Sequence, residues 1–278
     1  MSLFITSLNS GSNGNCYYIG NREEAVFVDA GLSCRETELR MKRLGLDMNR
    51  VKAIFISHEH SDHILGVSTL VAKYQIPVYV SQPTLKEAGF WKIRKFTVPF
   101  TAHQAIEIGK LRITAFPKKH DACDPHSFVV SEAKTHIGVF TDIGEPCDQL
   151  IHYFRQCHAA FLEANYDEEM LEKGRYPFIL KKRIRGGSGH LSNRQAMELY
   201  LNHKPAFMSH LLLSHLSMEN NKPELVESLF NSVPSDTRVI ITSRYQESAI
   251  YEIAAKESLL KILLPKMKPA RQQQLTLF

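Results

Sequence analysis

The chain has 278 residues, of which 44% are hydrophobic and 23% are charged, and its formal net charge is +5. This composition supplies enough apolar side chains for the core of one large domain, and it excludes a disordered chain. The mild positive charge permits a polyanionic substrate without requiring one. No apolar stretch is long enough to cross a bilayer, and the first residues do not resemble a signal peptide.

Strand-like and helix-like segments alternate along most of the chain. In chain order, the sequence predicts strands at 3–8, 16–19 and 25–29, a helix at 33–44, a strand at 51–57, a helix at 64–74 and a strand at 78–81. Strands follow at 95–99, 111–116, 127–131 and 137–141, then a helix after Pro146 and a strand at 160–163. Helices at 170–185 and 193–203, a strand at 207–214, a helix at 223–230 and a strand at 238–242 complete the pattern.

Sheets with interspersed helices indicate a layered α/β domain. The composition changes only near the end, so we expect one domain over residues 1–264 and a flexible basic tail over 265–278. The five cysteines are scattered and form no C-x-x-C pair, which fits reduced thiols better than a disulfide framework. Together with the missing export signal, this predicts a cytoplasmic protein with no membrane partner.

Three histidines and an aspartate lie within six residues, directly after the predicted strand at 51–57: His58, His60, Asp62 and His63. In an extended chain alternate side chains point the same way, so His58 and His60 are placed to bind one ion. Asp62 and His63 come after a turn and can face a second ion. Such ligands suit zinc, manganese or iron(II), and the absence of thiolates argues against a closed structural zinc site. The alternative is a polar loop whose histidines have no joint role.

The pattern His58-x-His60-x-Asp62-His63 resembles the signature of the metallo-β-lactamase superfamily, which implies an αββα sandwich. Further positions resemble the motifs of that superfamily: Asp29 in Val-Asp-Ala-Gly, His120 in Phe-Pro-Lys-Lys-His, Asp142 in Phe-Thr-Asp-Ile-Gly and His215 in Leu-Leu-Leu-Ser-His. The resemblance implies one metal held by His58, His60 and His120, and another held by Asp62, His63 and His215. It further implies that Asp142 bridges the two metals and that Asp29 orients the site without binding metal.

A histidine outside this set precedes a predicted helix, in Gly189-His190-Leu191-Ser192-Asn193. This segment is similar to the Gly-His-Ser-Thr element of ribonuclease Z and related phosphodiesterases, which implies that His190 assists the leaving group. Histidine suits that role because it donates a proton near neutral pH. Alternatively, His190 only precedes a helix that Ser192 caps. Asp62 is expected to serve as a metal ligand and as a proton acceptor.

One basic segment and one apolar segment at the end of the sequence bear on possible partners. Lys181, Lys182, Arg183 and Arg185 form a run that either lies on a solvated face or follows a nucleic-acid backbone. The last five residues, Gln274-Leu275-Thr276-Leu277-Phe278, resemble the bacterial sliding-clamp-binding peptide. That resemblance implies clamp binding through Gln274, Leu275, Leu277 and Phe278, and the alternative is that this peptide packs on its own domain.

Within the superfamily, residues 10–19, 55–63, 162–167 and 215–221 resemble the YycJ (WalJ) group. The group's implied activity is 5′-to-3′ exonuclease action on double-stranded DNA, linked to replication or mismatch repair. The sequence-based prediction is therefore a two-metal phosphodiesterase that acts on DNA. Two alternatives stay open: a small-molecule hydrolase for a cyclic phosphodiester or a thioester, and a clamp-associated binding protein with a vestigial site.

Overall fold

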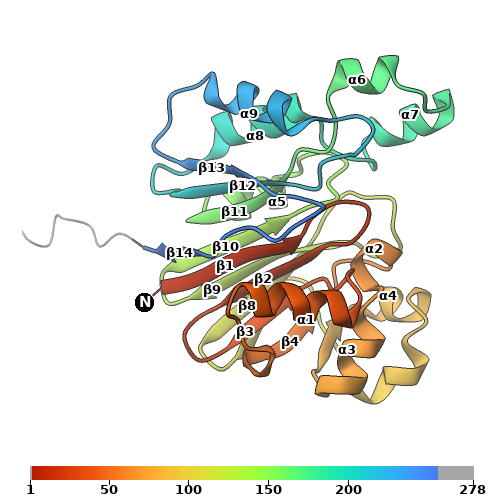
Figure 1. Ribbon diagram of the computed structural model, residues 1–278, viewed down its shortest axis with the longest axis vertical. Helices are drawn as coiled ribbons and strands as arrows, with labels where there is room; N and C mark the ends of the chain where they lie inside the picture. Colours follow the sequence, from red (N-terminus) through yellow and green to blue (C-terminus); the bar gives the residue numbers. More distant parts are fainter. Residues whose placement is uncertain (1, 256–278) are drawn as a thin grey trace, which may run out of the picture.

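The computed structural model describes residues 2–255, and in this part of the chain two seven-stranded sheets lie face to face (Figure 1). The first sheet has the strand order β14-β1-β2-β3-β4-β5-β6, and the second has the order β13-β12-β11-β10-β9-β8-β7. Helices α1 to α4 lie beside the first sheet, and α5, α8 and α9 lie beside the second. The predicted αββα sandwich is confirmed.

The strands of the first sheet are β1 (Ser2–Asn9), β2 (Cys16–Gly20), β3 (Ala25–Val28), β4 (Val51–Phe55), β5 (Val78–Val80), β6 (Thr97–Pro99) and β14 (Tyr251–Ala254). Those of the second are β7 (Ala105–Ile108), β8 (Leu111–Pro117), β9 (His126–Glu132), β10 (Thr135–Phe140), β11 (Ala159–Glu163), β12 (His210–Ser214) and β13 (Arg238–Ile241). The helices are α1 (Cys34–Arg43), α2 (Ser61–Ile64), α3 (Val67–Tyr74), α4 (Gln82–Glu87), α5 (Asp148–Phe154), α6 (Glu168–Lys173), α7 (Phe178–Ile184), α8 (Asn193–His203) and α9 (Pro223–Asn231), with 3-10 segments η1 (Met48–Arg50) and η2 (Phe90–Phe96).

Both faces of the central strands are buried, and alternate side chains enter different cores. In β2, Tyr17 and Ile19 face the second sheet, whereas Cys16 and Tyr18 face the helices beside the first sheet. The same alternation in β10 sends Val139 between the sheets and Phe140 toward α5. The sandwich therefore has three apolar layers, one between the sheets and one under each set of helices.

Several strands run parallel and end at the same edge of the sandwich. In one sheet β3 pairs with β4 and β4 pairs with β5, and in the other β10, β11, β12 and β13 pair in that order. Ligands of α/β sheets bind beyond the carboxyl ends of parallel strands. Residues that follow these strands in the sequence, such as Asp29, His58 and His215, are thereby placed at one edge.

The predicted helix at 170–185 is wrong in one respect: α6 and α7 are separate helices. Gly174 ends α6, and Pro177 precedes α7, since proline disfavours a continuous helix through its own position. The sequence also did not indicate α4, β7 or β14, and η2 covers part of the strand expected at 95–99.

The predicted domain end at residue 264 and the tail over 265–278 lie outside the described residues. The same holds for the residues predicted to bind a clamp, Gln274, Leu275, Leu277 and Phe278. Over residues 2–255 the structure contains no helix long and apolar enough to cross a membrane.

The loop that carries Asp62 is held against two earlier segments of backbone. The amide of Asn15 donates to the carbonyl of Asp62 at 2.7 Å, and Gly31 donates to the carbonyl of Asn15 at 2.8 Å. A Cβ atom at Gly31 would lie 1.7 Å from the Asp62 carbonyl oxygen, which is far closer than van der Waals contact. Only glycine therefore permits this approach.

We expect Gly31→Ala to lower the free energy of unfolding by about 1–3 kcal/mol, because the overlap forces the backbone apart. The change also displaces Asp62, so bound metal should fall. Urea unfolding and metal analysis measure the two effects. Gly187→Ala is the matched control, since the atoms nearest its added Cβ belong to the Glu145 side chain at 3.2 Å. Equal stability of both variants would contradict the steric argument.

Candidate metal centre

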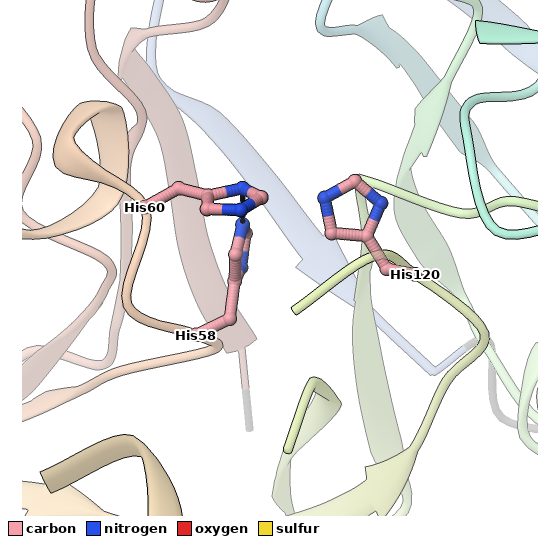
Figure 2. A group of neighbouring side chains, drawn as sticks. All are labelled: His58, His60 and His120. Carbon is pink, nitrogen blue, oxygen red and sulfur yellow. Dashed lines mark hydrogen bonds between the residues drawn. The ribbon is translucent and has the colours of Figure 1, made fainter. Parts of the chain in front are cut away.

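Three histidines form a first cluster, named group 1: His58, His60 and His120. His58 and His60 lie in the loop after β4, and His120 lies after β8 in the opposite sheet. The rings surround a common space (Figure 2), with 3.0 Å between His58 Nε2 and His60 Nδ1. One nitrogen of each ring lies within 4.8 Å of the other two, so three imidazoles converge.

A second cluster, named group 2, contains Asp62, His63 and His215. The Nε2 atoms of His63 and His215 lie 3.4 and 3.5 Å from Asp62 Oδ2. Asp142, which follows β10, lies between the groups. Its carboxylate oxygens are 3.2 Å from His63 Nε2, 3.4 Å from His215 Nε2 and 3.9 Å from His120 Nε2. The structure thus brings together all seven side chains predicted to bind metal.

The unsatisfied atoms of the two groups fit divalent cations. His120 Nε2 and Asp142 Oδ2 are buried and form no well-directed hydrogen bond within residues 2–255, although Asp142 Oδ2 lies 3.2 Å from His63 Nε2. A buried polar atom without a partner destabilises a protein, and a cation between these donors would remove that penalty. Imidazole and carboxylate ligands suit zinc, manganese and iron. The role of each residue as a ligand stays a prediction.

The two groups differ in electrostatics. Burial holds the pKa of His58 well below its usual value and lowers the pKa of His120 to about 4, so both rings are neutral. Burial also acts to lower the pKa of His63 and His215, but nearby carboxylates, Asp142 above all, outweigh it. They raise the pKa of His63 well above its usual range and that of His215 to about 10. Group 2 therefore holds protons where a metal would bind.

Asp29 lies behind both groups. Its carboxylate is fully buried and lies 2.7 Å from His63 Nδ1, and it accepts hydrogen bonds from the amide and hydroxyl of Ser57, each at 2.8 Å. Ser57 Oγ in turn lies 2.8 Å from His58 Nδ1. One carboxylate thus orients a histidine of each group through the nitrogen that faces away from the metal. This geometry supports the orienting role predicted for Asp29.

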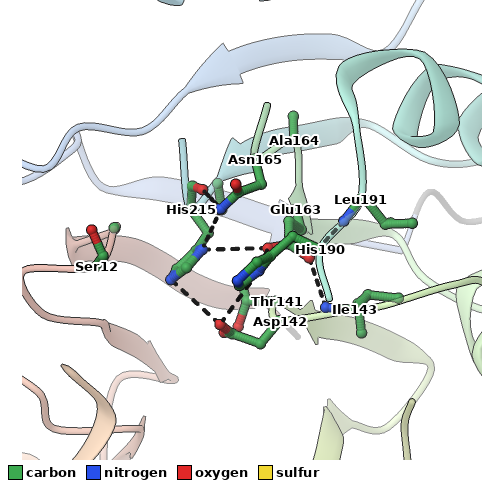
Figure 3. A network of polar contacts seen from close by, with 12 residues as sticks. Ser12, Thr141, Asp142, Ile143, Glu163, Ala164, Asn165, His190, Leu191 and His215 are labelled. Atoms are coloured by element: carbon green, nitrogen blue, oxygen red, sulfur yellow. Dashed lines mark hydrogen bonds and ion pairs between the residues drawn. The ribbon is translucent and has the colours of Figure 1, made fainter. Parts of the chain in front are cut away.

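A fully buried carboxylate that the sequence did not single out as functional, Glu163, lies beside group 2 (Figure 3). Its Oε1 atom is 2.7 Å from His190 Nδ1 and 3.3 Å from His215 Nδ1. Its Oε2 atom accepts hydrogen bonds from the amides of Ile143 and Leu191, at 2.6 and 3.2 Å. The available signal was its place at the end of a predicted strand, on the same edge as Asp142.

His190 lies at the entrance to this centre. Its Nδ1 atom is 3.9 Å from Asp142 Oδ1, and the side chain lines a pocket with Tyr176, Arg183 and His215. Ser192 does cap α8, through a reciprocal pair of hydrogen bonds with Gln195. The capping interpretation therefore holds for Ser192, while His190 itself faces the centre.

The comparisons with known proteins agree with this geometry. A family model described as a β-lactamase superfamily domain matches residues 24–215. The exodeoxyribonuclease YycJ of Bacillus anthracis is 34% identical over 238 residues, which cover 84% of this chain and 89% of that protein. The chain belongs to the metallo-β-lactamase superfamily. It is accordingly a metal-dependent hydrolase.

Solved structures of this superfamily share the fold at low sequence identity. The metallo-β-lactamase fold protein YhfI from Bacillus subtilis has a TM-score of 0.70 at 16% identity, over 90% of this chain and 99% of that one. The short form of human tRNase Z has a TM-score of 0.62 at 15% identity, over 88% and 98% of the two chains. These likenesses extend over nearly the whole described chain.

We expect the two metal groups of this superfamily member to load at different pH. His58 and His120 are neutral already at pH 6, so protons do not compete strongly for group 1. His63 and His215 must release protons to bind a cation, so affinity at group 2 rises with pH, about tenfold per pH unit for each proton released. Lowering the pH should therefore remove the group 2 ion first.

Dialysis between pH 8 and pH 6, followed by metal analysis, measures this order. His120→Ala and His215→Ala chains identify which ion is lost, because each variant lacks one ligand of one group. Simultaneous loss of both ions, or earlier loss from group 1, would show that the electrostatic difference does not govern loading.

Proposed function

We propose that the protein is a two-metal phosphodiesterase that degrades duplex DNA from an end, with 5′-to-3′ polarity. The observation that carries the proposal is the contact of 2.7 Å between His190 and the buried Glu163 beside group 2. This pair supplies a proton donor, which the departing oxygen of a phosphodiester requires. The named activity of YycJ, an exodeoxyribonuclease, supports DNA as the substrate. A role in replication or mismatch repair is part of the same proposal.

Divalent cations of zinc, manganese or iron in groups 1 and 2 would supply an acidified water and offset phosphate charge when bound. Asp62 stays ionised, because His63 and His215 hold its pKa well below the usual value against the opposing effect of burial. The low pKa keeps Asp62 charged but makes it a weak base, so it favours the role of metal ligand over that of proton acceptor for this residue.

Glu163 orients His190 for the departing oxygen. Burial alone would raise the pKa of Glu163, but His190 and His215 keep it below its usual value, so the carboxylate is charged. The Glu163 carboxylate is hydrogen-bonded to Nδ1 of His190. The Nε2 atom of His190 makes no hydrogen bond to any residue between 2 and 255. The free Nε2 is the atom that gives a proton to the leaving oxygen.

The surroundings of the pocket support a nucleic-acid substrate. Tyr176, Leu180 and Arg183 line it from α7 and the segment before that helix. Residues 168–185 contain six Lys or Arg and three Glu, so this side of the pocket carries net positive charge. A polyanionic strand is attracted to such a surface, whereas a neutral thioester gains nothing from it.

A substrate panel tests the reaction class. We expect 5′-phosphorylated duplex DNA to be hydrolysed faster than a small phosphodiester and far faster than a thioester, with zinc or manganese added. His58→Ala should reduce DNA hydrolysis at least about 100-fold, because group 1 loses a donor. Thioester preference, or full activity of His58→Ala, would overturn the proposal. Substrates labelled at the 5′ end or at the 3′ end show from which end nucleotides are released, and so give the polarity.

Leaving-group protonation is tested by His190→Ala. We expect kcat for DNA to fall about 10²- to 10⁴-fold with metal content unchanged. A phosphodiester with a nitrophenolate leaving group needs no proton, so its hydrolysis should change much less. Glu163→Gln should give an intermediate loss and a shifted pH profile, because it acts through His190. Equal losses for both substrates would point to a structural role.

A further inference from the structure

A second surface with aromatic and basic side chains lies on α4 and η2, outside the metal centre. We call it the α4–η2 patch, and it consists of Lys86, Trp91, Lys92, Arg94 and Lys95. The Trp91 side chain is 72% exposed, although Trp is a residue type that usually buries most of its surface. An exposed tryptophan among cations indicates a ligand that has both a flat face and negative charge.

The patch surrounds a hollow of about 310 Å³. Trp91, Lys86 and Arg94 line it, and the buried Phe90 lies beneath them. Lys92 Nζ lies 4.9 Å from the centre of the Trp91 ring. A planar group that enters the hollow would therefore meet an aromatic face with ammonium and guanidinium groups around it.

The cations of the patch form no close ion pairs with the described carboxylates. Within residues 2–255, none of its four Lys or Arg side chains forms an ion pair. On α6 and α7, by contrast, Arg183 pairs with Asp121 and Arg185 pairs with Glu172. Residues 86–96 contain four cations and one acid, Glu87. The patch is thus the more available of the two surfaces for an anionic ligand.

Helix α4, which carries Lys86 of the patch, is hydrogen-bonded to a loop of group 1. The Thr84 hydroxyl on α4 donates to the carbonyl of Asp124 at 3.4 Å, four residues after His120. In the same loop, the amide of Cys123 donates to Glu59, between His58 and His60, at 2.8 Å. Figure 1 shows α4 beside α2, the helix that carries Asp62 and His63. The helix that carries Lys86 therefore packs against the loops that hold group 1.

We propose that the α4–η2 patch binds an unpaired stretch of the nucleic-acid substrate. Trp91 stacks on a base, and the Lys and Arg side chains contact phosphates. Unpaired strand fits better than duplex, because the bases inside a duplex are not available for stacking. The inference rests on the proposed function, since exonuclease action on duplex DNA leaves the complementary strand unpaired beside the centre.

Trp91 is the only tryptophan of the chain, so its fluorescence reports occupancy directly. The full-length protein is titrated with a phosphorothioate-linked oligothymidylate of about 20 nucleotides. This length spans at least one single-strand-binding site of typical size. We expect saturable quenching that weakens with salt, and weaker quenching by a blunt duplex of equal length. Absence of quenching, or stronger binding of the duplex or of polyglutamate, would overturn the proposal.

Variants localise the binding. Fluorescence anisotropy of labelled oligothymidylate should show about 5- to 100-fold weaker binding for Trp91→Ala and near-normal binding for Trp91→Phe. Lys92→Gln with Arg94→Gln should lower the salt slope by about 1.4, at about 0.7 per phosphate contact on a single strand. Lys134→Gln is the matched control, since this exposed lysine lies in the turn before β10, at the far end of that strand from Asp142.

The two proposals fail separately. Hydrolysis of a small phosphodiester depends on the metal centre and should be unchanged in Trp91→Ala. DNA hydrolysis without quenching of Trp91 fluorescence would overturn only the proposal that the patch binds an unpaired strand. Quenching without DNA hydrolysis would overturn only the proposed nuclease function. Unchanged thermal unfolding of Trp91→Ala is expected, because the side chain is mostly exposed, and it shows that a loss of binding is not a loss of fold.

Discussion

Carboxylates that are withdrawn from water need positive charge close by, and this requirement governs the centre of the protein. Asp29, Asp142 and Glu163 are buried within one cluster, and for Asp142 and Glu163 burial by itself raises the pKa and so disfavours the ionised form. Histidines offset this cost, because His63 and His215 keep the pKa of Asp142 well below its usual value. Without metal those imidazoles carry protons, and cations bound in groups 1 and 2 would supply the same positive charge.

The backbone supports this cluster at the strand ends. Asp29, Asp142 and His215 have φ angles of 61°, 54° and 59°, a left-handed conformation that is unfavourable for residues other than glycine. Asp29 and His215 directly follow β3 and β12, and Asp142 comes two residues after the end of β10, so each turn bends a side chain toward the cluster. Lys118 is buried behind it and donates to the carbonyl of Thr141 at 2.7 Å, next to Asp142. The unfavourable backbone conformation thus occurs at the three positions where it brings charged side chains together.

Much of this arrangement was predictable from the sequence. The cluster from His58 to His63 indicated metal chemistry because several donors lie close along the chain, and the periodicity of the strands indicated a layered fold. Glu163 was not identified, since its function depends on contacts with His190 and His215, 27 and 52 residues further along. The break between α6 and α7 was missed because helical spacing persists on both sides of Pro177. Nor does sequence reveal exposure, which is what distinguishes Trp91 from a core residue.

The two metal groups draw on both halves of the sandwich. In each group, residues after β4 or on α2 belong to the first sheet, whereas His120 and His215 follow strands of the second. Every cation would therefore act as a non-covalent cross-link between the sheets, at the edge where the strands end. Loading then stabilises the native fold by mass action, because the unfolded chain does not present these donors together. The same atoms that perform the chemistry fasten the two halves of the molecule to each other.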